Sequence, residues 1–119
     1  MGDRGQVKII QWGDKPVYLY THYFGSELVE TVKKALQKKW RWNDGPYLTR
    51  IIFCEMVMGY EDEEIGFGIS SGECDHYVSV NLHVKNQTVE VVRFGEIEFE
   101  GSFEDFIIHK AKHSKEDSQ

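Results

Sequence analysis

Residues 77–84 alternate apolar and polar side chains, which is the two-residue period of a half-buried β-strand, and residues 88–94 form a second run that returns beside the first. A short polar segment, residues 85–87, separates the two runs, so the pattern predicts a β-hairpin. Residues 96–100 place two apolar residues between glutamates and predict a further strand. The side chains that should face the core in the first strand of this hairpin are Val78, Val80, Leu82 and Val84.

Another hairpin is predicted nearer the N-terminus. Residues 6–12 and 17–24 are rich in β-branched and aromatic side chains, and the Gly-Asp-Lys-Pro segment between them is typical of a turn. The segment 67–70, which lies among glycines, predicts one more short strand.

The segment after residue 25 has the 3.6-residue period of an amphipathic helix. Ser26 is the predicted N-cap, because a serine oxygen can accept a hydrogen bond from a free NH group of the first turn. The apolar stripe of this helix consists of Val29, Val32, Leu36 and Trp40. The basic residues Lys33, Lys34, Lys38 and Arg41 fall on another face.

Two further helices are predicted. Residues 43–46, Asn-Asp-Gly-Pro, interrupt the first helix, and helical spacing of apolar residues resumes over 47–58. Ser102 then begins a capping-box pattern that opens a last helix over residues 103–110. The end of the chain, residues 113–119, is polar and is expected to form a flexible tail.

Strands and helices are segregated along the chain, which favours an α+β fold over an alternating parallel α/β fold. We expect a mostly antiparallel sheet of two or three hairpin pairs, with two central helices and a C-terminal helix packed on one face. The chain has 119 residues, of which 40% are hydrophobic, so residues 1–112 are expected to form a single domain with its own core. A monomer or a small homo-oligomer is expected.

Cysteine content and hydropathy limit the chemistry and the location. Cys54 and Cys74 are the only cysteines, and neither has the paired spacing of zinc or thioredoxin-like motifs. We therefore expect no cofactor and no metal. The chain starts without an apolar run and has no stretch long enough to span a bilayer, so a cytoplasmic location without membrane contact is predicted.

The distribution of charge limits the class of partner. The net charge is −6, but residues 1–59 carry 9 basic and 6 acidic side chains, and the remainder carries 5 and 14. Binding to duplex DNA is disfavoured, because affinity for DNA depends on neutralising phosphates with lysine and arginine. A protein partner or a small anionic ligand is the expected alternative.

Candidate chemistry concentrates where the strand over 17–24 gives way to the first helix. Tyr20 and His22 share one face of that strand, and Gly25 and Ser26 follow it. Free NH groups at a helix start bind anions, so a phosphate or carboxylate could be held near His22. A strand buried on both faces, with His22 as a structural residue, is the competing interpretation.

A second polar cluster lies in residues 70–76, just before a predicted strand, where loops often carry functional residues. We expect both clusters to meet in one cleft and to form a ligand-binding site. Its members would be Tyr20, His22, Gly25, Ser26, Ser70, Ser71, Asp75 and His76.

Cys74 belongs to two alternative hypotheses. Together with His76 and either His22 or His83 it could bind a metal such as zinc. Together with His22 and Asp75 it could instead form a nucleophilic site, because a thiol needs a neighbouring base to become a thiolate.

Two charged stretches also have structural interpretations. Residues 38–42, KKWRW, pair basic with aromatic side chains, a combination that can bind single-stranded nucleic acid. Trp40 already belongs to the apolar stripe, however, and Trp42 with Arg41 is more typical of a basic surface that covers a tryptophan. The acidic segment 61–64 lacks the spaced ligands of a calcium loop, so we interpret it as a solvated loop.

The stretch VYLYTHYFGSELVETV, residues 17–32, resembles small uncharacterised prokaryotic and phage-borne proteins, as do PYLTRIIFCEM and GFGIS after it. Those proteins often begin with a Met-Gly-x-Arg-like segment and carry a Tyr-Leu-x-x-His-aromatic-x-Gly junction between strand and helix. The resemblance extends to about residue 75 and implies a mobile-element or viral setting, but no activity. Phe24 stands where a glycine is usual in that group.

These observations favour a noncatalytic binding or regulatory module. The enzyme alternative is a small hydrolase or phosphoryl-transfer domain that uses His22 at the helix start. A second alternative is an acidic inhibitor that binds a protein or imitates nucleic acid, with charge complementarity controlling the encounter.

Overall fold

Six strands form one sheet in the computed structural model, which describes residues 3–11 and 15–109. The order across the sheet is β3-β2-β1-β4-β5-β6, and every neighbouring pair is antiparallel except the parallel pair β1 and β4. The strands are β1 (Gly5–Ile10), β2 (Val17–Thr21), β3 (Phe67–Ser70), β4 (Val78–His83), β5 (Thr88–Arg93) and β6 (Glu96–Ser102). The predicted hairpins β1–β2 and β4–β5 are both confirmed.

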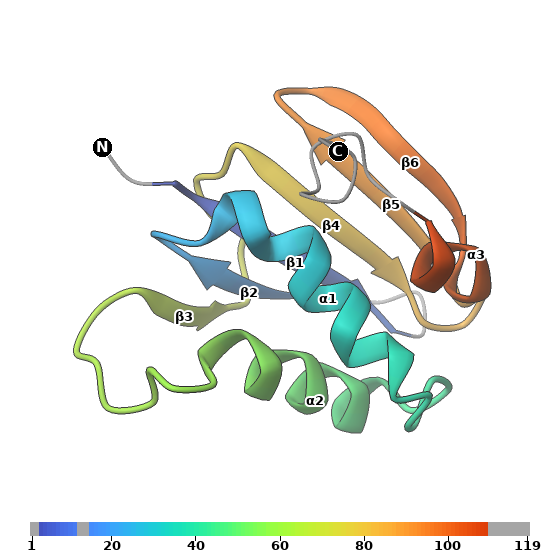
Figure 1. Cartoon of the computed structure of the whole chain (residues 1–119), viewed down its shortest axis with the longest axis horizontal. Coiled ribbons are helices and arrows are strands. Elements are labelled where there is room, and N and C mark those ends of the chain that lie inside the picture. The colour runs from blue at the N-terminus through green and yellow to red at the C-terminus, as the bar shows by residue number, and fades with distance from the viewer. Residues whose placement is uncertain (1–2, 12–14, 110–119) are drawn as a thin grey trace, which may run out of the picture.

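Three α-helices cover one face of this sheet (Figure 1). They are α1 (Leu28–Gln37), α2 (Gly45–Val57) and α3 (Phe103–Ile108), and a short 3-10 turn, η1 (Gly25–Glu27), precedes α1. The protein is therefore an α+β fold with a mostly antiparallel sheet, as the segregated pattern predicts. None of the helices in the described part of the chain has the length and apolar character needed to cross a bilayer.

The core lies between the sheet and the helices. Each helix contributes fully buried side chains, among them Leu36 of α1, Leu48 of α2 and Phe103 of α3. The alternating strand residues complete the core, and the four predicted inward side chains of the β4 run, Val78, Val80, Leu82 and Val84, are all at most 1% exposed. Burying this apolar surface is the main term that stabilises the fold.

Two of the three helices begin at side-chain caps. Ser102 Oγ accepts a hydrogen bond from Asp105 N at 3.0 Å, which confirms the predicted start of α3. Asp44 Oδ1 accepts from Tyr47 N at 3.4 Å, and Pro46 stands in the first turn of α2, where its missing NH group costs nothing. The predicted tail 113–119 and part of the predicted turn 13–16 lie outside the described residues.

The predicted N-cap role of Ser26 is wrong. Strand β2 ends at Thr21 instead of continuing to residue 24, because Thr21 Oγ1 accepts a hydrogen bond from Phe24 N at 3.2 Å and the chain bends there. The 3-10 turn follows, and α1 starts only at Leu28, without a side-chain cap.

The apolar stripe of α1 is shorter than predicted. Val29, Val32 and Leu36 are buried, but α1 ends at Gln37 and Trp40 is 56% exposed. Lys39 and Arg41 have φ angles of 59° and 56°, which unwind the chain beyond the helix. The chain therefore turns Trp42, and not Trp40, against the core.

Lys33 does not lie on a solvent-exposed face. It is 6% exposed, and its Nζ contacts Glu30 Oε2 at 3.2 Å and the carbonyl oxygen of His109 just after α3. The ammonium also lies 5.9 Å from the centre of the Phe106 ring. Lys33 thus joins α1 to the end of α3 as a buried charge whose polar atom is satisfied.

Candidate functional site

The junction between β2 and α1 holds the N-terminal segment of the chain. Gly25 N donates to Asp3 O at 2.7 Å, and Ser26 N donates to Asp3 Oδ2 at 2.9 Å. The carboxylate of Asp3 therefore occupies a place at the start of η1 where the sequence predicts an external anion. His22 Nδ1 and the Tyr20 hydroxyl form a hydrogen bond of 2.8 Å.

Three of the predicted site residues meet in a shallow pocket of about 270 Å³. Tyr20, Ser70 and Asp75 line it together with Gly68, Ile69 and Cys74. Arg4 Nη1 contacts Asp75 Oδ2 at 2.7 Å, but the Asp75 side chain is 78% exposed, so this ion pair adds little stability. The predicted residues that do not line this pocket are His22, Gly25, Ser26, Ser71 and His76.

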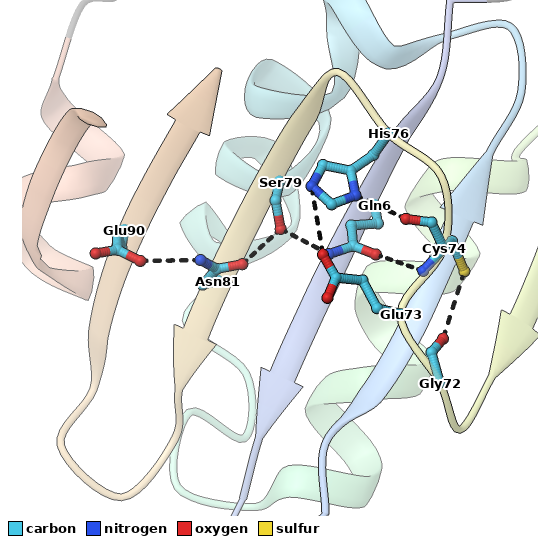
Figure 2. Close-up of polar contacts among 8 residues, drawn as sticks. All are labelled: Gln6, Gly72, Glu73, Cys74, His76, Ser79, Asn81 and Glu90. Carbon is cyan, nitrogen blue, oxygen red and sulfur yellow. Dashed lines mark hydrogen bonds and ion pairs between the residues drawn. The ribbon is translucent and has the colours of Figure 1, made fainter. Parts of the chain in front are cut away.

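Residues 71–77 cross the sheet on the face that the helices leave open. Cys74 N donates to Gln6 Oε1 at 3.0 Å, and Gln6 Nε2 donates to Ser79 Oγ at 2.9 Å (Figure 2). Ser79 Oγ donates to Asn81 Oδ1 at 2.6 Å, and Asn81 Nδ2 donates to Glu90 Oε1 at 2.9 Å. Gln6 and Ser79 are buried, so this network satisfies their polar groups and holds residues 71–77 on the sheet.

The contacts around Cys74 do not activate its thiol. His76 Nδ1 lies 2.7 Å from the carbonyl oxygen of Cys74, which can only accept, so Nδ1 carries a proton (Figure 2). The other ring nitrogen faces Glu73 Oε2 at 3.8 Å. Burial raises the pKa of the Cys74 thiol, and the negative charge of Glu73 raises this pKa further. A hydrogen bond with the Ser70 side chain lowers the pKa in part. The described residues contain no group of three or more His, Cys, Asp or Glu that could hold a metal ion.

We expect the Cys74 thiol to react slowly with iodoacetamide at neutral pH and faster as the pH rises above the ordinary thiol pKa. The thiolate is the reactive form, and a raised pKa reduces its fraction at any pH below that value. The measurement is the alkylation rate of the Cys54→Ser variant, which leaves Cys74 as the only thiol, followed by mass spectrometry between pH 7 and pH 10. The same variant unfolded in urea is the control. Faster alkylation in the folded state than in urea would revive the nucleophilic hypothesis.

A larger hollow, about 540 Å³, lies on the helix-covered side of the β5–β6 hairpin; we call it the β5–β6 groove. Its apolar lining comes from α1, β5, β6, α3 and the hairpin turn, namely Val29, Val91, Phe94, Ile97, Phe99 and Phe106. Its polar lining consists of Arg93, Glu96, Glu98 and His109. None of these residues is among the site residues predicted from the sequence.

Phe94 is held at the end of this groove in an unusual conformation. It forms the two-residue turn between β5 and β6 with Gly95, and their φ angles are 51° and 82°. Two consecutive positive φ angles define a type I′ turn, for which Asn-Gly is the favoured pair. A phenylalanine with positive φ is strained, and this one is also 75% exposed.

The sequence does contain a signal for this turn, because Phe-Gly stands between the runs that became β5 and β6. It is a weak signal, since glycine alone supports many turns and phenylalanine supports none.

A search against known proteins found no protein family, no curated protein and no solved structure that matches this chain. The geometry of the described residues therefore carries the functional argument. The polar residues around β2 and residues 71–77 are dispersed, whereas the β5–β6 groove is continuous.

Proposed function

We propose that this protein is a noncatalytic binding module, that its partner is another protein, and that the partner docks on Phe94 and the β5–β6 groove. The observation that carries the proposal is Phe94, an aromatic side chain exposed at a turn position that disfavours it. Strain of this kind costs roughly 1–3 kcal/mol and tends to persist where a side chain serves function.

The surroundings of Phe94 suit an interface. Ile97, on the same hairpin, is 59% exposed, and the groove beside it falls within the roughly 300–1,000 Å³ typical of binding pockets. Exposed aromatic side chains next to a pocket are common anchors of protein interfaces. One side chain of the partner would enter the groove while Phe94 packs against the partner's surface.

The hydrolase alternative has less support. It needs free NH groups at the start of the helical segment, but Gly25 N and Ser26 N already donate to Asp3. It also needs His22 beside them as a base, and the His22 imidazole is bonded to Tyr20. Turnover of a phosphodiester or ester that is lost in a folded His22→Ala variant would restore this alternative.

We expect Phe94→Asn to lower affinity for a selected peptide at least about tenfold while leaving the fold as stable or slightly more stable. Asparagine suits a type I′ turn but removes the aromatic contact. The peptides would be selected from a displayed random library against the wild-type protein, and their dissociation constants measured by isothermal titration. Urea unfolding of the same variant reports stability.

Ile69→Thr is the matched control, because Ile69 is 64% exposed but lies on β3, at the opposite edge of the sheet. Peptides that need the groove should bind this variant as tightly as the wild type. If no selected peptide distinguishes Phe94→Asn from the wild type, the groove is not the docking surface and the proposal fails.

A further inference from the structure

We infer that the group which the β5–β6 groove takes from the partner is a lysine side chain; this inference rests on the proposed function and names the chemistry of that contact. Two features of the groove carry it. One is a carboxylate at its hairpin end without a counter-charge, and the other is a cluster of aromatic rings along its length.

The charges of the groove leave one acidic group uncompensated. Arg93 Nε donates to Glu98 Oε2 at 2.6 Å, and these side chains are only 16% and 23% exposed, so the two charges neutralise each other. Glu96 also lines the groove and is exposed, and its carboxylate has no hydrogen bond or ion pair with the side chains of the described residues. An incoming cation would complement this carboxylate, whereas an anion would be repelled by it.

The aromatic rings of the groove suit the stem of the same side chain. The ring of Phe99 lies near those of Phe106 and His109, with ring centres 5.5 Å and 4.6 Å away. The Phe106 ring already has a cation near it, since Lys33 Nζ lies 5.9 Å from its centre. The rings therefore offer apolar surface to the methylene stem of a lysine, whose ammonium is left for the carboxylate of Glu96.

A lysine side chain matches a groove that is apolar along its length and carries a carboxylate at its hairpin end. Its alkyl stem can lie on the apolar residues while its ammonium reaches the carboxylate of Glu96 at the hairpin end. Arginine fits less well, because its planar guanidinium is best satisfied by paired acceptors and the carboxylate of Glu98 is already bound to Arg93.

The test compares the N-acetyl methylamides of lysine, norleucine and arginine as ligands of the 119-residue chain. Norleucine keeps the alkyl stem and lacks the ammonium, so the comparison isolates the charge. Amide signals of residues 93–99 are followed by NMR during titration. We expect lysine to bind about two- to fivefold more tightly than norleucine, and this preference to weaken at high salt.

Glu96→Gln should remove most of the preference for lysine while leaving the affinity for norleucine unchanged. Glu100→Gln is the matched control, because Glu100 belongs to the same strand but pairs with Glu90 and does not line the groove. Lys110, Lys112 and Lys115 follow the groove residue His109 in the chain. Both titrations are therefore repeated with these three lysines changed to glutamine, which excludes competition from the same molecule.

Each other outcome overturns the inference. If norleucine binds as well as lysine, the groove is a simple apolar site, and the proposed docking function survives without the lysine. A preference for arginine over lysine also rejects the inference. So does an equal loss of lysine affinity in Glu96→Gln and Glu100→Gln. If neither lysine nor norleucine shifts the signals of residues 93–99, in the wild type or in the variant without the three lysines, the inference and the proposed docking on the groove are both rejected.

Discussion

Gly25→Ala is expected to lower the free energy of unfolding by about 3 kcal/mol, because a side chain at this position would overlap with the backbone. A Cβ atom at Gly25 would lie 2.7 Å from both Asp3 O and Arg4 O. Carbonyl oxygens cannot rotate away as a flexible side chain can, so residues 3–4 would have to move. That movement would also break the hydrogen bonds from Gly25 N and Ser26 N to Asp3.

Urea unfolding followed by circular dichroism measures this change. Gly68→Ala is the matched control, because Gly68 lies in β3 and a Cβ atom there would meet nothing within 4 Å. We expect the control to stay within about 0.5 kcal/mol of the wild type. If both variants are equally stable, residues 3–4 do not pack against the junction and the place of Asp3 in it is wrong.

The glycine at this junction is thus explained by space and not by backbone freedom. Gly25 has no positive φ angle, so its backbone is one that other residues adopt. What requires glycine is the close approach of the chain's own N-terminal segment, which then uses the free NH groups. The signature that the sequence presents as an anion site is, in the structure, a contact within the chain.

Local patterns predicted the elements well, because each one is decided by neighbouring residues. Alternation predicted β4, the turn at residues 85–87 predicted its hairpin with β5, and the serine oxygen of Ser102 predicted the start of α3. Sheet order could not be predicted in this way. The parallel pairing of β1 with β4 joins residues more than 70 positions apart, such as Gly5 and Val78, and no short pattern encodes it.

The candidate site was predicted only in part for the same reason. Tyr20, Ser70 and Asp75 do share a pocket, because β2 and β3 are neighbours in the sheet. The network from Gln6 to Glu90 and the β5–β6 groove each combine residues from three or more elements. Their members are ordinary residues in the sequence, and only the tertiary arrangement brings them together.

Trp42→Ala should cost roughly 2–3 kcal/mol of unfolding free energy, whereas Trp40→Ala should change it by less than about 0.5 kcal/mol. Trp42 Nε1 donates to Leu36 O at 3.0 Å, and its ring meets Phe103 edge-on with 5.3 Å between ring centres. Removing it would open a cavity beside α3 and leave a carbonyl group of α1 without this donor.

The expected loss of unfolding free energy is smaller for Trp40→Ala, because this side chain is more exposed. Its ring is 56% exposed, and the contact that it makes is with Lys38, whose Nζ lies 5.1 Å from the ring centre. Helical periodicity places Trp40 on the core stripe and Trp42 outside it, so the two variants test where α1 ends. Urea unfolding of both variants decides this, with each serving as the other's control. A larger loss in Trp40→Ala would mean that α1 continues through residue 40 and that the left-handed turns at Lys39 and Arg41 are wrong.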